Sequence, residues 1–488
     1  MADGSEQVIQ ASAGSTVADV LAQAGVQLSA LDRTEPALTT ILQENTAISI
    51  IRVKESFEVV ERELPFEQIT VRNETLTAGQ QLLVQAGSNG LEEITYRVLT
   101  ENGKETSRMV AASRVLQEPK PEIIMVGVHS LAQSTDLPGR LAFLAGGSAW
   151  MLEGSTGNRQ PLILTGDLDG RVFELSEDGS WLLYTRAGST PDTINTLWAA
   201  EITATGVEEH DLGVENIIHF ASWVPGEDLE ITCSTVEPRD TAPGWQANND
   251  LIWLELAPSG RVISRETVIE PHSGGLYGWW GTSYLWSPDG SRLAFARPDA
   301  IGLINLKNGR SEVLAELLPA QTDGEWAWVP GLTWDKDSRS LLWVQHETAP
   351  GYFPREKSPR YSVAEIDIST GTMLTRVSDA GMFAAPVPSP DRTRLAYLQA
   401  IFPAQSDTSR YRLVVSSMNG TRAQLLFPGE GSAGLTPQVV AWSPESKSPA
   451  AVDRIALIYQ GNLWLVDAQT GYGQQVTADG TITGIDWK

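Results

Sequence analysis

The predicted fold is based on one segment, Leu285-Trp286-Ser287-Pro288-Asp289-Gly290-Ser291-Arg292-Leu293-Ala294-Phe295. Its apolar beginning is typical of a strand that ends at Trp286, and Ser-Pro-Asp-Gly has the composition of a tight turn. Leu293 then begins the returning strand. The segment is therefore one β-hairpin, which needs neighbouring strands to form a stable sheet.

Versions of this hairpin recur at intervals of 45 to 63 residues through the carboxyl-terminal two thirds of the chain. The positions that align with Trp286 are Leu175, Trp223, Trp334, Pro388, Trp442 and Trp487. A third and a shorter fourth strand follow, as at 462–467 and 474–477. Repeats of this length are typical of sheets that stack face to face around a ring. We predict a mainly β protein with a seven-bladed β-propeller over residues 141–488.

The two ends of this repeat region complement each other. Residues 141–144, 149–152 and 161–164 predict three strands of a blade that has no first strand. Residues 482–487 predict a first strand with nothing after it. We therefore expect the last strand to complete the first blade and close the ring.

Two smaller domains precede the propeller. Residues 1–60 predict a small α+β, β-grasp-like domain, in which a helix begins after Ser15-Thr16 and strands lie at 8–10 and 48–53. Residues 61–128 alternate between apolar and polar side chains and contain an Asn102-Gly103 hairpin turn, which predicts an extended β-sheet domain. Residues 129–140 are a linker.

These segments resemble known families. Residues 61–128 resemble the G-five domain in a set of short motifs: Glu63-Leu64-Pro65-Phe66-Glu67, Leu76-Thr77-Ala78-Gly79, Gly87-Ser88-Asn89-Gly90, Tyr96-Arg97-Val98, Asn102-Gly103-Lys104-Glu105 and Val126-Gly127. The preceding segment, with Thr16-Val17-Ala18-Asp19-Val20-Leu21, resembles the small ubiquitin-like domain that often precedes it in bacterial cell-wall proteins. The repeats resemble the TolB-like, WD-like propeller. The resemblance implies a cell-surface setting, binding of N-acetylglucosamine-containing polymers and no catalytic residues in the G-five domain.

Composition excludes several classes of partner. The chain has 35 basic and 61 acidic residues, a net charge of −26, so it repels phosphate backbones, and we expect no nucleic-acid partner. No apolar run reaches the roughly 18 to 20 residues of a membrane span, so no membrane insertion is expected in this segment. The single cysteine, Cys233, is expected to be a small buried side chain. The amino terminus shows no export signal, and we expect one upstream of an extracellular, cell-surface protein.

No catalytic or cofactor-binding motif is evident. The five histidines are scattered, and no metalloprotease, hydrolase-elbow or phosphate-loop pattern is present. Asp167-Leu168-Asp169-Gly170 and Asp335-Lys336-Asp337 could supply oxygen ligands to calcium, but aspartates at blade turns more often bind their own backbone. We predict no catalytic residue, no cofactor and no metal site.

Aromatic side chains mark one face of the predicted propeller. The long connections between second and third strands share a face with the links between blades. The predicted ligand-binding residues on this face are Trp245, Tyr277, Trp279, Trp280, Trp326, Trp328, Tyr352 and Phe353. Flat rings can stack on a sugar or peptide. The alternative is that these rings pack the insertions onto the ring of blades.

The sequence thus predicts a non-catalytic, monomeric, extracellular bacterial binding protein. Its amino-terminal domains would bind a cell-wall or extracellular polysaccharide, and its propeller a second ligand, either a protein or a polysaccharide. Two alternatives remain open: a protein-interaction scaffold of an envelope complex, which binds an envelope or surface protein, and an enzyme that acts on polysaccharides.

Overall fold

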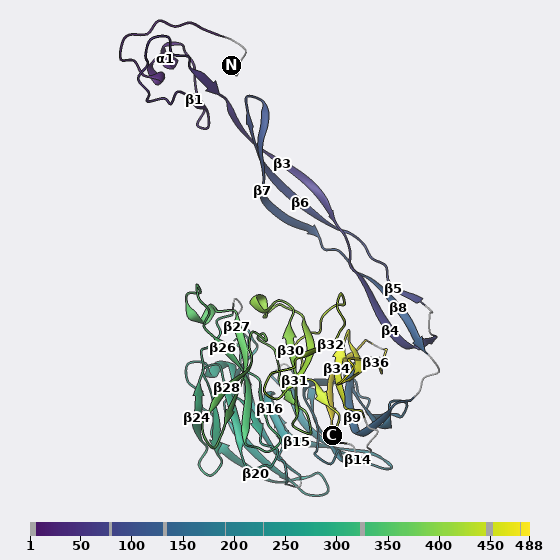
Figure 1. Ribbon diagram of the computed structural model, residues 1–488. Helices are drawn as coiled ribbons and strands as arrows, with labels where there is room; N and C mark the ends of the chain where they lie inside the picture. The colour runs from purple at the N-terminus through teal and green to yellow at the C-terminus, as the bar shows by residue number, and fades with distance from the viewer. Residues whose placement is uncertain are drawn as a thin grey trace. The chain divides into compact units, whose positions relative to one another are not determined.

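The computed structural model describes residues 6–77, 81–129, 134–190, 192–227, 229–322, 327–445, 452–478 and 480–488 (Figure 1). The chain divides into two compact units: Met1–Arg72 with Gly79–Val126, and Asn73–Ala78 with Gly127–Lys488. Within the described residues, no helix has the length and apolar character needed to cross a membrane.

The first unit begins with the short helix α1 (Val17–Gln23). Thr16 and Asp19 form a reciprocal capping box at its start, which satisfies free amides of the first turn. Strands β1 (Arg33–Glu35) and β2 (Ser49–Ile51) pair antiparallel beside it. The predicted strand at 8–10 is wrong, because these residues form no strand and Val8 is 97% exposed. An apolar residue with nothing to pack against gains nothing from strand formation.

The chain continues as two three-stranded sheets. The first has the order β3 (Val53–Leu64), β6 (Gly90–Glu101) and β7 (Lys104–Gln117). The second has the order β4 (Gln68–Thr77), β8 (Glu122–His129) and β5 (Gln81–Gln85). Asn102 and Gly103 both have positive φ, as the predicted hairpin turn requires. Strand β3 begins at Val53, so the sheet starts before the predicted domain limit at residue 61.

The β3–β6–β7 sheet is a single layer with a very small core. Ile94 and Val98 are its buried apolar side chains. Cross-strand ion pairs supplement them: Arg62–Glu92, Arg97–Glu55 and Arg108–Glu58. The sheet therefore depends on backbone pairing and cross-strand side chains more than on burial.

Asp32 ties the first sheet to the segment that precedes it. Its carboxylate accepts hydrogen bonds from the backbone N–H groups of Ser29 and Val53 and from the Arg52 guanidinium. These bonds hold the pKa of Asp32 well below its usual range. Asn102, in the β6–β7 turn, also exchanges hydrogen bonds with the backbone of Arg52.

The described residues of the second unit form seven antiparallel sheets of a ring, which confirms the predicted propeller (Figure 1). The first blade contains β9 (Asp136–Ala145), β10 (Ser148–Ser155), β11 (Arg159–Ile163) and β37 (Ile482–Trp487). Blade two contains β12 (Leu168–Leu175), β13 (Trp181–Ala187), β14 (Asn195–Thr203) and β15 (Gly206–Glu215). Blade three contains β16 (Ile217–Trp223), β17 (Glu230–Pro238), β19 (Leu251–Leu256) and β20 (Val262–Ile269), and the short strand β18 (Trp245–Ala247) pairs with β17.

The remaining four blades have the same order. Blade four contains β21 (Ser283–Trp286), β22 (Leu293–Arg297), β23 (Ala300–Asn305) and β24 (Arg310–Glu316). Blade five contains β25 (Leu332–Trp334), β26 (Ser340–Glu347), β27 (Arg360–Asp367) and β28 (Met373–Val377). Blade six contains β29 (Val387–Pro388), β30 (Arg394–Ala400), β31 (Tyr411–Ser417) and β32 (Gln424–Phe427). Blade seven contains β33 (Ala441–Trp442), β34 (Arg454–Tyr459), β35 (Asn462–Asp467) and β36 (Gly473–Gln475).

Ring closure follows the prediction. Strand β37 pairs antiparallel with β9, and Trp487 lies opposite Leu141. The indole N–H of Trp487 donates to the carbonyl of Pro138 at 2.7 Å. The end of the chain thus completes the first blade.

The repeated tryptophan joins adjacent blades. The indole N–H groups of Trp223, Trp334 and Trp442 donate to backbone carbonyls of the first strand in the preceding blade, those of Glu174, Leu285 and Val387 respectively. Each ring is buried, so one side chain supplies both apolar area and a satisfied polar group. The motif is scaffold chemistry, repeated around the ring.

The turn after this tryptophan is stabilised by hydrogen bonds between its own residues. In Ser287-Pro288-Asp289-Gly290 the Asp289 carboxylate accepts hydrogen bonds from the Ser287 hydroxyl and the Ser291 amide. Gly290 has φ +67°, and an added Cβ would lie 2.0 Å from the carbonyl oxygen of Pro225. The aspartate is therefore used by its own turn.

Glu174, in strand β12, lies near two other charged groups. Its carboxylate accepts a hydrogen bond from Ser222 and lies 4.0 Å from the Lys488 ammonium, which is 3.9 Å from Asp486. Burial raises the pKa of Glu174 to about 7; the Lys488 charge opposes this rise and the Asp486 charge adds to it.

Glu174→Gln should therefore change the pH dependence of stability. The raised pKa means that the wild-type fold loses stability as pH rises from about 4 towards 7, because the folded state favours the neutral acid. Gln keeps the acceptor for Ser222 and does not ionise. Thermal unfolding should show similar midpoints at pH 4 and a more stable variant at pH 8, by up to about 3 kcal/mol. The exposed Glu177→Gln is the control, and an equal difference at both pH values would contradict the argument.

Candidate ligand-binding site

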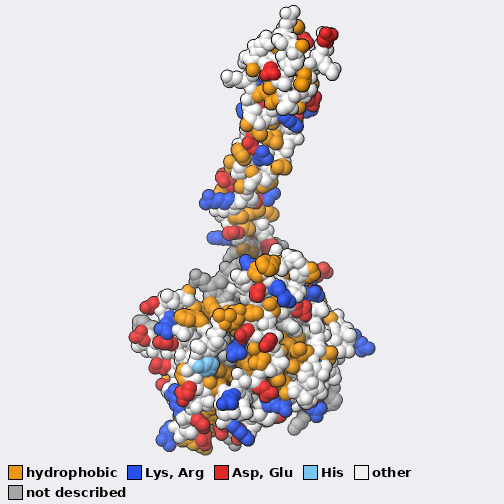
Figure 2. Space-filling view, turned by 90° about the vertical axis from the view of Figure 1, so that its left-hand side faces the viewer, with side chains coloured by type: hydrophobic (Ala, Val, Ile, Leu, Met, Phe, Trp, Pro, Cys, Tyr) orange, Lys and Arg blue, Asp and Glu red, His pale blue; other side chains and the backbone are white. Residues whose placement is uncertain are grey.

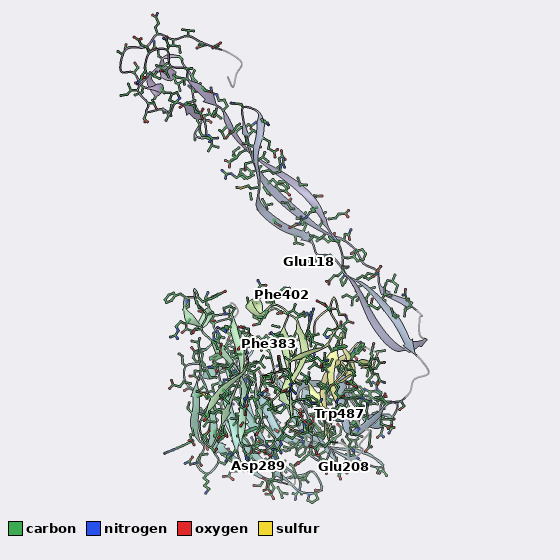
Figure 3. All side chains as sticks on the ribbon, viewed as in Figure 1. Glu118, Glu208, Asp289, Phe383, Phe402 and Trp487 are labelled. Atoms are coloured by element: carbon green, nitrogen blue, oxygen red, sulfur yellow. The ribbon has the colours of Figure 1, made fainter. Side chains whose placement is uncertain are left out.

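The connections of the propeller lie at two opposite ends. Figure 3 shows Phe402, from a connection between second and third strands, at the end of the propeller away from Asp289 and Glu208. Asp289 lies in a turn between first and second strands, and Glu208 lies in β15 near the turn between third and fourth strands. We call the end with Phe402 and the inter-blade links the insertion face.

Two tryptophans on the insertion face lie together. Trp245 is in β18, and Trp280 ends the short 3₁₀ helix η1 (Gly278–Trp280) in the link between blades three and four. Their ring centroids are 6.2 Å apart at 88°, which is an edge-to-face contact. Trp279 is 40% exposed beside them, and Tyr277 is half-buried. We call Trp245, Trp279 and Trp280 the aromatic shelf.

Asn249 fixes the shelf. Its buried side-chain amide donates to the carbonyl of Gly278 at 2.8 Å and accepts from the Thr282 hydroxyl at 2.9 Å. Asn249 has φ +52°, a conformation that asparagine tolerates better than most residues. One residue of the blade-three insertion therefore holds the turn that contains η1.

His219 lies beneath the shelf. Its ring contacts that of Trp245 edge-to-face, with centroids 4.7 Å apart. Burial, with a contribution from the charge of Arg171, lowers the pKa of His219 to about 4, so the ring is neutral at physiological pH. Its Nε2 is buried and has no hydrogen-bond partner among the described residues. His219 thus packs against the aromatic shelf as a neutral aromatic ring.

The predicted ligand residues of blade five lie elsewhere on the insertion face. Tyr352 is 47% exposed and Phe353 is 93% exposed, both in the insertion 348–359. Phe402, from the blade-six insertion, is also exposed. In Figure 2, apolar side chains on the side of the propeller that faces the viewer reach the surface between acidic and basic ones.

Trp328 has a packing role. It is only 4% exposed, and its ring lies edge-to-face against Tyr361, with centroids 5.2 Å apart. The side chain is therefore part of the apolar cluster of blades five and six. Trp326 lies outside the described residues.

The structure thus brings Trp245, Tyr277, Trp279 and Trp280 together and leaves Tyr352 and Phe353 in a second loop. Sequence reasoning did not single out Asn249 or His219. Asparagine at a loop end is a weak signal for positive φ, and nothing local marks a histidine that packs under a distant tryptophan.

The aspartates considered as calcium ligands bind protein groups. Asp169 accepts hydrogen bonds from Asn195 and Thr185, and Asp335 accepts them from the amides of Arg339 and Ser340. Among the residues that the structure describes, no group of three His, Cys, Asp or Glu side chains is placed to hold a metal ion. Cys233 is fully buried, as expected, and burial raises the pKa of its thiol to about 12.

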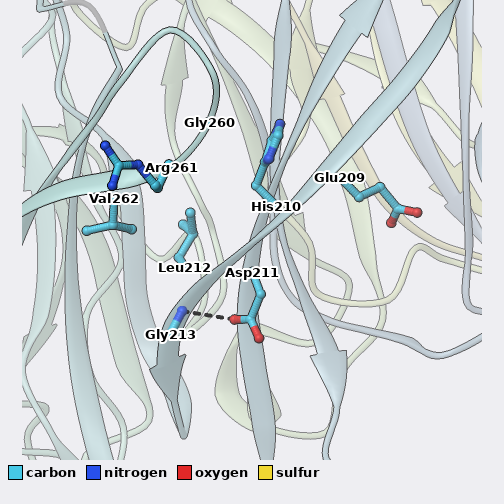
Figure 4. Close-up of a pocket in the computed structure, with 8 residues that line it drawn as sticks. All are labelled: Glu209, His210, Asp211, Leu212, Gly213, Gly260, Arg261 and Val262. Carbon is cyan, nitrogen blue, oxygen red and sulfur yellow. Dashed lines mark hydrogen bonds between the residues drawn. The ribbon is translucent and has the colours of Figure 1, made fainter.

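A shallow open groove of about 420 Å³ lies between two outer strands of blades two and three (Figure 4). It is lined by residues 209–213 of β15 and by 260–262 at the start of β20. The Asp211 carboxylate accepts a hydrogen bond from the amide of Gly213 at 2.9 Å. An added Cβ at Gly260 would lie 2.1 Å from the His210 ring, so the turn and the ring are closely packed. None of the predicted aromatic residues lines this groove.

Family comparisons identify the amino-terminal segments. A family model described as the G5 domain matches residues 55–129. A second, described as the G5-linked ubiquitin-like domain, matches residues 1–39. Both matches agree with the resemblances that the sequence showed.

Curated relatives share only part of the chain. Resuscitation-promoting factor RpfB of Mycolicibacterium smegmatis is 28% identical over 117 residues, which is 24% of this chain and 32% of the relative. Resuscitation-promoting factor Rpf2 of Corynebacterium glutamicum is 30% identical over 157 residues, which is 32% of this chain and 41% of the relative. The chain therefore spans well under half the length of these relatives.

Two solved structures are similar to parts of the chain at low identity. TolB from Acinetobacter baumannii has 14% identity and a TM-score of 0.38, over 78% of this chain and 98% of its own. The HP0197-G5 structure has 22% identity and a TM-score of 0.15, over 16% of this chain and 99% of its own. The chain thus contains a segment that matches the G5-linked ubiquitin-like domain, a segment that matches the G5 domain and a β-propeller of seven sheets, in that order.

Proposed function

We propose that this protein is a non-catalytic binding protein of the bacterial cell surface, retained at the cell wall by its amino-terminal domains. The observation that supports this most directly is the G5 match over residues 55–129, since G5 domains are associated with cell-wall binding. Two matched relatives are resuscitation-promoting factors, which are similar to this chain over 117 and 157 residues. The ligand that we propose is a polymer that contains N-acetylglucosamine.

One row of cross-strand side chains on the β3–β6–β7 sheet has suitable chemistry for a sugar chain. Phe57 of β3 lies opposite Arg97 of β6, which lies opposite Met109 of β7, so all three side chains share one face. Phe57 is 61% exposed and Met109 is also exposed. An exposed ring next to a guanidinium offers stacking for the apolar face of a sugar and hydrogen bonds for its edge.

Sedimentation with purified peptidoglycan tests this half of the proposal. We expect the full chain and residues 1–128 to co-sediment, and residues 134–488 to remain in solution. Phe57→Ala should weaken retention by about tenfold, a loss comparable to one stacking contact. Leu82→Ala, which removes an exposed apolar side chain from the other sheet, is the matched control. Equal retention of residues 1–128 and residues 134–488 would argue against the proposal.

The propeller would then present a second ligand site on the insertion face. The exposed apolar side chains of three separate segments, Trp279, Phe353 and Phe402, support a protein or polysaccharide ligand there. A role as a protein-interaction scaffold is the second candidate. Phe353, an aromatic side chain that is 93% exposed, is the residue that we expect a partner protein to cover.

A further inference from the structure

His346 joins three segments of the insertion face. It lies near the end of β26, is 2% exposed, and stacks on Tyr361 with centroids 4.8 Å apart and planes at 19°. Its Nε2 lies 2.7 Å from the carbonyl oxygen of Ser358, at the end of the insertion that contains Tyr352 and Phe353. Its Nδ1 lies 3.1 Å from the carbonyl oxygen of Leu318 and 3.2 Å from that of Pro319, in the link between blades four and five.

Both ring nitrogens of His346 therefore face hydrogen-bond acceptors. A carbonyl oxygen can only accept a hydrogen bond, and a neutral imidazole has a single N–H. Both ring nitrogens of His346 face carbonyl oxygens, so both contacts are hydrogen bonds only when both nitrogens carry a proton. In the neutral ring, one nitrogen lone pair would face a carbonyl lone pair in a buried place, which is unfavourable.

Charged residues lie on the strands and in the insertion that contact the ring. Glu347 follows it in β26, and Arg360 at the start of β27 pairs with both Glu347 and Asp379. The 3₁₀ helix η2 (Arg355–Lys357), which contains Glu356, lies in the insertion. Burial and the charge of Asp407 both raise the pKa of the stacked Tyr361, which therefore stays neutral.

We propose that His346 is a pH-responsive clasp. When its ring is protonated, it holds the insertion 348–359 against the link between blades four and five. When the ring is neutral, its hydrogen bond to one of these two segments is lost. The inference rests on the proposed function, because this insertion presents Tyr352 and Phe353 on the insertion face. A hydrogen bond from the amide of Gln321 to the carbonyl of Glu356 also joins the two segments, so release loosens the insertion without detaching it. Histidine is the side chain suited to such switching near neutral pH.

Hydrogen exchange and imidazole NMR on the full chain test the clasp. After correction for the intrinsic rate, protection of the amides in 348–358 should fall about tenfold between pH 5 and pH 8. His346→Gln, which does not titrate, should make that protection independent of pH. His210→Gln, in the groove away from the insertion face, is the matched control and should behave as wild type.

A second measurement uses only the wild-type chain, so its result does not depend on whether the variant folds. Nitrogen-15 shifts of His346 in the wild-type chain should show protons on both ring nitrogens at pH 5 and on one at pH 8. A single protonated nitrogen at both pH values, or protection of 348–358 that does not change with pH, would overturn the proposal. Neither readout uses a ligand, so a propeller that binds nothing would contradict the proposed function and leave the clasp intact.

Discussion

Trp487→Ala should lower the free energy of unfolding of the propeller by about 3–5 kcal/mol, the usual cost of removing a buried tryptophan. The ring is buried against residues of the first and last blades, and its N–H bonds to Pro138. Because β37 is the only strand of its blade that comes from the end of the chain, the loss should also open the ring at β37 and β9 first. Thermal unfolding measures the loss, and hydrogen exchange of β37 and β9 locates it.

Two further substitutions distinguish the loss of the buried indole ring from the loss of ring closure at β37. Trp487→Phe keeps most of the apolar contact and loses the N–H, so it should cost about 1–2 kcal/mol. Trp334→Ala removes the equivalent ring from blade five, whose four strands are contiguous in sequence. It should destabilise the propeller without raising exchange selectively in β37. If exchange in β37 is no faster in Trp487→Ala than in Trp334→Ala, the closing strand is not the weak point.

Asn249→Ala should loosen the aromatic shelf and cost about 2–4 kcal/mol. The substitution removes the hydrogen bonds of the Asn249 side chain with the Gly278 carbonyl, which keeps the amide of Gly281, and with the Thr282 hydroxyl, each a loss of about 1–1.5 kcal/mol. It also places a less tolerant residue at φ +52°. Amide exchange in 272–281 should rise, and the fluorescence of Trp279 and Trp280 should shift towards that of solvated indole.

Asn248→Ala is the matched control for this substitution. Asn248 is the preceding residue, and its side chain donates to the Thr235 hydroxyl within its own insertion. Its loss should leave exchange in 272–281 unchanged. Equal effects of the two substitutions would mean that Asn249 does not position the shelf. Once a ligand of the insertion face is known, Asn249→Ala and Trp279→Ala should both weaken its binding.

The sequence predicted the propeller because the information is local and repeated. The turn Ser287-Pro288-Asp289-Gly290 bonds to itself, and Trp286 and its counterparts recur at blade intervals, so each hairpin can be recognised alone. Closure by β37 followed from simple strand counting. The predicted strand at 8–10 failed because a short strand-like run says nothing about whether a partner strand is available.

Only the tertiary structure decided what each aromatic ring does. Trp279 and Trp328 both lie in glycine-containing links and are alike as sequence, yet one is exposed and the other buried. The residues that control the insertion face act over long sequence separations: Asn249 bonds to Gly278, and His346 contacts Leu318 and Ser358. Local patterning thus determines which strands form and in what order. The loops depend on buried polar contacts between distant segments, and these exist only once the ring has closed.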